Sequence, residues 1–223
     1  MIRVEGLTVV RAGERVLEGL SFEARPGDTI ALLGRSGSGK SAVLLAAAGG
    51  LRPSAGRVVV EPGTRVGYVP AVLAAWPVVR ADEFLEFGGI ASGLSGKPLH
   101  GAVARGLSMA GLSDRPGIRI DALSDGHRKR LLVARALIDD PDLLLLDDPF
   151  ASLDPAGRRQ IERLVGDAGL AGRTVIAAVN DAHLSSCWSR VFLLQAGRLV
   201  RDVPIPRDVD DLESWGEQFV EPE

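Results

Sequence analysis

The sequence predicts an α/β fold with a mostly parallel sheet covered by helices, an antiparallel β subdomain at the N-terminus and an inserted α-helical subdomain. Three observations support this prediction. Short apolar strands alternate with helical segments, turn residues punctuate residues 2–24, and no convincing strand occurs between residues 76 and 121. Alternation of strands and helices is typical of a doubly wound core. A chain of 223 residues fits a single domain, residues 1–223.

Composition narrows the class of protein. The chain is 46% hydrophobic and 25% charged, which is typical of a globular domain. A net charge of −3 argues against a broad nucleic-acid-binding face, so no nucleic-acid partner is expected. The basic cluster at residues 127–130 is interpreted as a helix surface. Cys187 is the only cysteine, which excludes a disulfide framework, favours a reducing compartment and predicts a small, half-buried side chain.

The first elements follow from the spacing of apolar and turn residues. Residues 2–24 read as antiparallel strands. Residues 29–33 form a short apolar strand that leads into a glycine-rich loop, and the Ala- and Leu-rich residues 41–49 predict a buried helix. Two further strands are expected at residues 57–60 and 65–69, on either side of a Glu-Pro-Gly turn.

The second half predicts a helical insert and then a return to the core. The insert spans about residues 76–135, where ADEFLEF and HGAVARGLSMAGL have helical spacing and the turn-rich SGLSGKP separates them. Four consecutive leucines at residues 143–146 predict a central strand, and residues 173–179 predict another after a helix that begins near Pro155. The acidic tail, about residues 203–223, is expected to begin with a short docked segment.

The glycine-rich loop predicts a nucleotide site and, with it, a P-loop NTPase core. GRSGSGKS fits GxxxxGK[ST] between a strand and a helix. Glycines permit the turns that aim backbone N–H groups at phosphates, and the helix N-terminus adds partial positive charge. Lys40 is expected to neutralise phosphate charge and Ser41 to ligate Mg²⁺, so ATP and Mg²⁺ are the expected cofactors. The residues of the predicted loop are Gly34, Arg35, Ser36, Gly37, Ser38, Gly39, Lys40 and Ser41.

A second run of motifs resembles a known family. LSDGH at residues 123–127 stands where ABC ATPases have LSGGQ, LLLLDD at residues 143–148 stands where they have LLLLDE, and ASLD at residues 151–154 resembles their D-loop. The resemblance covers nearly the whole chain. It implies head-to-tail dimers with two ATP molecules at the interface, each held by the Walker motifs of one subunit and the signature of the other. The residues it places beside nucleotide are Leu123, Ser124, Asp125, Gly126, His127 and Asp154.

Physical chemistry is consistent with these roles. Ser124 and the backbone N–H groups of a helix N-terminus can bind a γ-phosphate that a partner chain presents. Asp125 suits the first turn of a helix, although its carboxylate would repel phosphate if it pointed inward. Asp147 ends the leucine strand, where a carboxylate can hold Mg²⁺ through water opposite Ser41.

Two departures from the family concern hydrolysis. Asp148 stands where the family has the glutamate that activates water. Its side chain is one methylene shorter, so Asp148 is a candidate base that is expected to activate water less efficiently. Asn180 aligns with the histidine that contacts the γ-phosphate, and an amide cannot carry charge or shuttle a proton. His183, three residues later, is either a substitute or a surface histidine.

Two further departures concern sensing and adenine binding. Ala71 occupies the position of the Q-loop glutamine, which in the family helps to ligate Mg²⁺ and relays the nucleotide state to the helical insert. Arg11 lies near the place of an aromatic ring that stacks on adenine, and its guanidinium plane could stack instead. Together the departures predict MgATP binding with slow turnover by the chain alone.

These observations favour one function and leave an alternative. The favoured function is the ATP-binding subunit of an ABC transporter, working with a separate transmembrane permease subunit and forming a homodimer or a heterodimer with another ABC ATPase. The longest apolar stretch, residues 42–51, is too short to span a bilayer, so the expected location is cytoplasmic, peripheral at the inner face of the cell membrane. WPVVRADEFLEF is similar to a run of export-type subunits. The alternative is a non-transport ABC-type ATPase that acts as a regulatory or assembly module.

Overall fold

A computed structural model of the chain describes residues 1–71, 79–179 and 185–205. Its first sheet is antiparallel, has the order β2-β1-β4, and comprises β1 (Ile2–Arg11), β2 (Glu14–Ala24) and β4 (Ala55–Val60). The expected antiparallel start of the chain is therefore confirmed. The strand expected at residues 57–60 is β4, and it joins this sheet by pairing with β1.

The second sheet forms the α/β core. Its order is β5-β6-β7-β3-β8-β9, and all neighbours pair in parallel except β9, which runs antiparallel to β8 at the edge. The strands are β3 (Thr29–Leu33), β5 (Val66–Val69), β6 (Leu143–Asp147), β7 (Thr174–Val179), β8 (Arg190–Gln195) and β9 (Arg198–Pro204). The predicted fold class is confirmed. The β8–β9 pair is an addition, because it was not among the expected strands, and β9 contains the start of the acidic tail.

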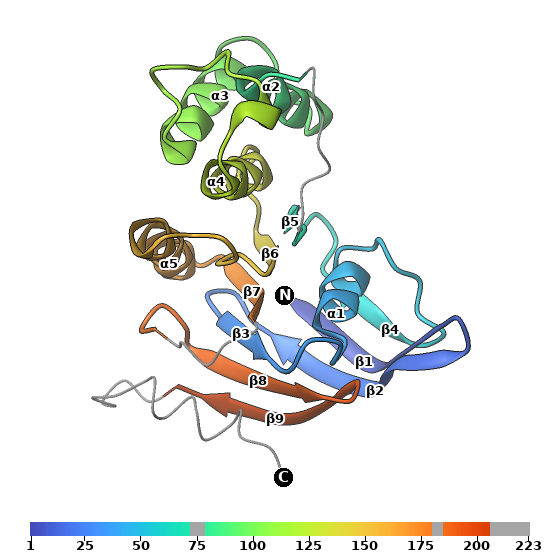
Figure 1. Ribbon diagram of the computed structural model, residues 1–223. Coiled ribbons are helices and arrows are strands. Elements are labelled where there is room, and N and C mark those ends of the chain that lie inside the picture. Colours follow the sequence, from blue (N-terminus) through green and yellow to red (C-terminus); the bar gives the residue numbers. More distant parts are fainter. Residues whose placement is uncertain (72–78, 180–184, 206–223) are drawn as a thin grey trace.

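Helices cover this sheet and form the insert. They are α1 (Lys40–Ala47), α2 (Ala81–Ala91), α3 (Gly96–Ala110), α4 (Asp125–Ala136) and α5 (Pro155–Leu170), with a 3-10 turn, η1 (Ile120–Ala122), before α4. Figure 1 shows α2, α3 and α4 together at the end of the molecule away from β8 and β9. Helix α3 begins within the segment expected to be a turn. Pro98 does not prevent this, because the first-turn N–H groups of a helix have no intrahelical partner.

Two hydrophobic cores hold the parallel sheet between layers. Leu144 and Leu146 of β6 pack into the core shared with the helical insert and α5, while Leu143 and Leu145 pack into the core shared with α1 and the first sheet. Burying each of these side chains contributes roughly 2 kcal/mol. The alternation fixes β6 on both faces, so the carboxyl ends of β3 and β6 are held at one edge of the sheet. Within the described residues, no helix is long and apolar enough to cross a membrane.

Candidate nucleotide site

The phosphate loop leaves the end of β3 in a conformation that requires glycine. Gly34 has φ 155°, and a Cβ atom there would lie 2.3 Å from the carbonyl oxygen of Leu194. Gly39 has φ 103° and caps α1, and a Cβ atom there would lie 2.7 Å from a methyl carbon of Leu17. The loop is therefore pressed between β2 and the end of β8, with the N-terminus of α1 directed at its centre.

Lys40 is a buried cation inside this loop. Its Nζ donates hydrogen bonds to the carbonyl oxygens of Gly34 at 2.6 Å and Arg35 at 3.0 Å, and the residue is 7% exposed. Burial lowers the pKa of Lys40, while Asp147 and Asp148 raise it. The ammonium group is thus held where negative charge on a ligand would relieve its desolvation.

The rest of the loop divides into an exposed rim and a buried wall. Arg35, Ser36 and Gly37 are exposed, whereas Ser38 is buried. Among the residues that the structure describes, the Ser38 hydroxyl is a buried polar group without a hydrogen-bond partner. A buried hydroxyl of this kind gains free energy when a ligand supplies a partner. This observation favours a polar ligand at the loop.

Ser41 and Asp147 meet at the edge of the sheet. The Ser41 hydroxyl donates to Oδ1 of Asp147 at 3.0 Å. Burial raises the pKa of Asp147, the hydrogen bond from Ser41 lowers it, Asp148 raises it, and the two nearby lysines, Lys129 and Lys40, lower it. A hydroxyl and a carboxylate are hard oxygen donors of the type that Mg²⁺ prefers, so this pair fits that ion.

Asp148 follows Asp147 in a left-handed backbone conformation. Its φ is 48°, its side chain is half-buried, and its N–H donates to the carbonyl oxygen of Ala178 at 3.0 Å. Positive φ at a residue other than glycine is uncommon, and such positions occur at functional sites. Asn180 and His183 lie outside the described residues. The strand before them, β7, pairs with β6 at Asp147 and Ala178.

Ala71 has a partner that sequence reasoning missed. Its carbonyl oxygen accepts a hydrogen bond of 2.8 Å from Nζ of Lys129 in α4, and Lys129 is only 5% exposed. The interpretation of the 127–130 cluster as helix surface is therefore wrong for Lys129. The helical spacing of the sequence could have predicted that Lys129 faces the core, because the apolar residues Leu132, Val133 and Ala136 follow it at spacings of three, four and seven. In the structure all three are buried.

The signature residues form a separate group at the start of α4. Leu123 is buried, and Ser124 caps the helix by accepting from the N–H of His127 at 3.4 Å. Nδ1 of His127 also lies 2.8 Å from the Ser124 hydroxyl. Asp125 forms an ion pair of 3.3 Å with Arg128, and its side chain is exposed. Its carboxylate is thus balanced by a cation of the same helix.

The D-loop lies directly beside the signature. A Cβ atom on Gly126 would lie 3.7 Å from Leu153 and Ser152. Asp154 caps α5 by accepting the N–H of Gly157 at 2.7 Å. The two motifs therefore form one surface. Within the described residues, no hydrogen bond joins this surface to the phosphate loop of the same molecule.

Arg11 ends β1 at the tip of the first hairpin. It is exposed and lies opposite Glu14 in the β1–β2 register. The same hairpin reaches the phosphate loop farther along, where Val16 and Leu17 face Gly39. The position of Arg11 is thus linked to the loop by the adjacent strand.

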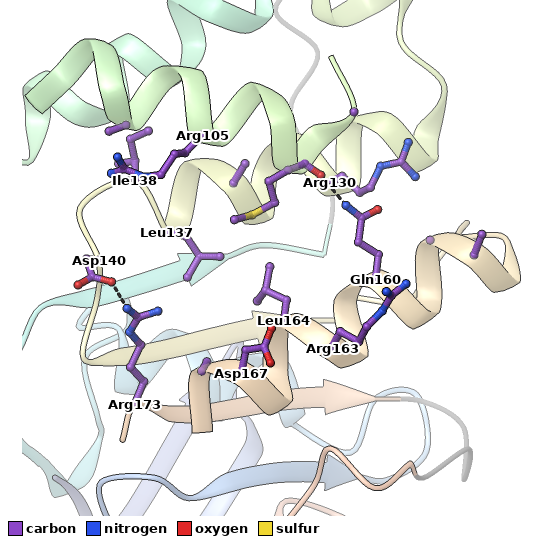
Figure 2. Close-up of a pocket in the computed structure, with 18 of the residues that line it drawn as sticks. Arg105, Arg130, Leu137, Ile138, Asp140, Gln160, Arg163, Leu164, Asp167 and Arg173 are labelled. Carbon is purple, nitrogen blue, oxygen red and sulfur yellow. Dashed lines mark hydrogen bonds and ion pairs between the residues drawn. The ribbon is translucent and has the colours of Figure 1, made fainter. Parts of the chain in front are cut away.

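A cavity lies away from the phosphate loop. It has a volume of about 1120 Å³ and is lined by residues of α3, α4 and α5. Figure 2 shows Gln160 of α5 reaching across it to the carbonyl oxygen of Met109, a hydrogen bond of 2.8 Å. Asp140 and Arg173 form an ion pair at its other end. The groove thus lies between the helical insert and α5, beside the hydrophobic core that they share.

Comparisons with known proteins agree with this geometry. The ABC transporter family matches residues 17–151. The chain is 36% identical over 218 residues to an aliphatic sulfonates import ATP-binding protein, SsuB 1, of Streptomyces avermitilis, covering 94% of this chain and 80% of that protein. It is 35% identical over 202 residues to a zinc import ATP-binding protein, ZnuC, of Jannaschia sp., covering 87% and 79%. Among solved structures, it is similar to cbiO1 of Clostridium perfringens, part of the transporter complex cbiONQ, with a TM-score of 0.76, 25% identity and coverage of 91% and 88%.

Proposed function

This chain belongs to the ABC transporter family as an ATP-binding subunit with ATP hydrolase chemistry, and on that premise we propose that it binds MgATP between its own phosphate loop and the signature of a second ATPase subunit. Closure around ATP would drive a separate membrane subunit. The groups proposed for the phosphate half are Lys40, Ser41 and Asp147, and those for the signature half are Ser124, Gly126 and Asp154.

One observation carries the proposal: the 3.0 Å contact between the Ser41 hydroxyl and Asp147, with the Lys40 ammonium beside it. Ser41 would ligate Mg²⁺ directly and Asp147 through water, and Lys40 would exchange a loop carbonyl for a phosphate oxygen. The metal would neutralise charge on the β- and γ-phosphates. In the described part of the chain the phosphate loop and the signature form separate surfaces, which is consistent with a second subunit that completes each site.

Turnover by the isolated chain is proposed to be slow. Asp148 is the candidate base, and its shorter side chain holds the carboxylate about 1 Å farther from water than a glutamate would, a misplacement that can reduce rate about 100-fold. Asn180 would donate a hydrogen bond to the γ-phosphate without adding charge. Arg11 would stack on adenine through its guanidinium plane.

The proposed partner is a transmembrane permease subunit, which would hold this chain at the cytoplasmic face of the membrane. The compared relatives are import ATP-binding proteins for unrelated solutes, a sulfonate and a zinc ion. We therefore propose import, and we assign the choice of solute to the permease. This direction differs from the export-type likeness of residues 76–87.

Two measurements test the proposal. Calorimetric titration of the full chain should show MgATP binding that is weakened at least about tenfold by Lys40→Ala, because the phosphate loses its buried counter-charge. Affinity purification from native membranes, followed by mass spectrometry, should recover a polytopic membrane protein. Unchanged affinity in Lys40→Ala would overturn the site, and recovery in a complex that contains only soluble proteins would overturn the transporter role.

A further inference from the structure

Lys129 is a buried charge that the proposed function does not use. It lies in α4 between two arginines that are more exposed, and only 5% of its surface is accessible. Burying an ammonium group is unfavourable unless nearby groups compensate its charge. Polar or negatively charged groups must therefore lie near the Lys129 ammonium to offset the cost of burying it.

Two kinds of group face the Lys129 ammonium. Its Nζ donates to the carbonyl oxygen of Ala71 at 2.8 Å, two residues beyond the end of β5. Asp148 and then Asp147 attract it electrostatically, and both oppose the lowering of the Lys129 pKa by burial. Strand β5 lies next to β6, with Val69 opposite Leu146, which brings the Ala71 carbonyl to the same edge as the two carboxylates.

Two lysines from different parts of the fold interact favourably with the carboxylate pair. Lys40, from the phosphate loop, responds to both Asp147 and Asp148, as Lys129 does. In the ATP-bound state proposed above, Lys40 is committed to phosphate. Lys129 does not belong to the phosphate loop but to the helix that begins with the signature, and its ammonium remains hydrogen-bonded to Ala71 beside the two carboxylates.

We propose that Lys129 is a positioning residue of the ATP site, whose ammonium holds the Ala71 carbonyl on one side and orients Asp148 on the other. It thereby links the metal-binding end of β6 to the helical insert. Ala71 cannot provide this link through its own side chain, which has no polar group. The inference rests on the proposed function, because it assigns a role in the same site.

The test compares three replacements of Lys129 in the full chain. Lys129→Met removes both charge and donor, Lys129→Gln retains a donor without charge, and Lys129→Arg retains both. Lys97→Met is the matched control, because Lys97 is the one lysine of the chain besides Lys40 and Lys129, and it is exposed at the start of α3. For each variant, MgATP affinity, the single-turnover hydrolysis rate at saturating protein, and the thermal unfolding midpoint are measured.

Lys129→Met and Lys129→Gln are both expected to slow single turnover at least about tenfold while MgATP affinity changes less than about threefold. Lys129→Arg is expected to recover most of the rate, and Lys97→Met to behave as the unaltered chain. Lys129→Gln keeps the test valid if Lys129→Met fails to fold. Hydrogen exchange adds a second readout: MgATP should protect residues 66–71 in the unaltered chain and protect them less in Lys129→Gln.

The outcomes separate this inference from the proposed function. If the unaltered chain binds MgATP and both neutral variants hydrolyse it at the unaltered rate, the role of Lys129 is overturned and the proposed function stands. If the neutral variants lose rate only in proportion to a lower unfolding midpoint, and Lys129→Arg does not recover it, Lys129 is merely structural and the inference is again overturned. If the unaltered chain binds no MgATP, both fall together.

Discussion

At the scale of single residues, Asp148 combines a short side chain with a left-handed backbone. Asparagine tolerates this conformation as well as aspartate does, so Asp148→Asn removes the carboxylate without adding backbone strain. We expect Asp148→Asn to reduce single turnover at least about tenfold with MgATP affinity retained, because the candidate base is lost. A quench measurement of released phosphate checks this. Robust hydrolysis that survives Asp148→Asn would contradict the assignment.

The reverse change at the same position tests whether reach limits the rate. Asp148→Glu extends the carboxylate by one methylene, and we expect single turnover to rise about tenfold or more. The glutamate must adopt the same positive φ, which costs about 1 kcal/mol of stability. Unfolding in urea measures that cost, and the Asp148→Asn chain serves as its control. A rate that stays the same or falls would mean that the reach of the side chain is not the limit.

Cys187 illustrates how packing sets reactivity. Burial raises the pKa of the Cys187 thiol to about 12, an effect that the contact with the Ser185 hydroxyl only partly offsets. At pH 8 the thiolate is therefore on the order of one molecule in 10,000. We expect a thiol reagent such as DTNB to react at least about 100-fold more slowly with the native chain than with the chain in guanidinium. Because this is the only cysteine, similar rates in the two states would contradict the burial directly.

At the scale of elements, Asp154 has two possible contributions that one pair of variants separates. Its carboxylate caps α5 through the N–H of Gly157. Asp154→Ala should lower the free energy of unfolding by about 1 kcal/mol. Asp154→Asn retains a capping oxygen and should change the free energy of unfolding by only about 0.3 kcal/mol. Chemical denaturation measures both. If the carboxylate also serves the subunit interface, Asp154→Asn should weaken MgATP-dependent association at unchanged stability, and normal association would limit Asp154 to capping.

Most elements could be predicted from the sequence because their patterns are local. The four leucines of β6 and the apolar run of β7 have no polar face, which is typical of central parallel strands. The placement of β4 could not be predicted, because its residues suit either sheet and only tertiary pairing with β1 decides. The hairpin β8–β9 did leave a signal, an apolar run followed by Ala196-Gly197, both with positive φ.

The site was predictable in part for the same reason. Ser41 and Asp147 follow strands of one parallel sheet, so their motifs predict a shared edge, and the structure places them 3.0 Å apart. The environment of Lys129 could not be predicted from charge alone. Its neighbours in sequence are arginines, which suggest a solvated face, whereas the packing of α4 against the end of β5 buries the middle cation. A run of basic residues does not show which of them is buried, because burial depends on which side of the helix faces the core.

At the scale of the whole molecule, the site exists as two surfaces held by different layers. The phosphate surface is fixed by the parallel sheet between its two cores, and the signature surface belongs to α4 and the start of α5. The groove lined by α3, α4 and α5 lies between the insert and α5. Gln160 of α5 spans that groove and binds the Met109 carbonyl of α3, so it ties the helical insert to α5.

This arrangement predicts association that depends on nucleotide. With hydrolysis slowed by Asp148→Asn, the chain of 23.5 kDa should double its mass in MgATP and return to 23.5 kDa when ATP is removed. Light scattering after size exclusion measures this. Opposing charge is small, because each chain carries a net charge of only −3. A mass that stays at 23.5 kDa in MgATP would mean that the second ATPase subunit is a different chain.

The orientation of the pair can be tested by mixing two defective chains, both in the Asp148→Asn background. Lys40→Ala damages the phosphate half of every site in its own dimer, and Ser124→Arg blocks every signature half, so neither chain should dimerise alone. In a head-to-tail pair of the two, the intact phosphate loop of one faces the intact signature of the other, and one complete site returns. We therefore expect the mixture, and neither component, to form dimers in MgATP. Failure of the mixture, when the Asp148→Asn parent does dimerise, would mean that each nucleotide is held by a single chain.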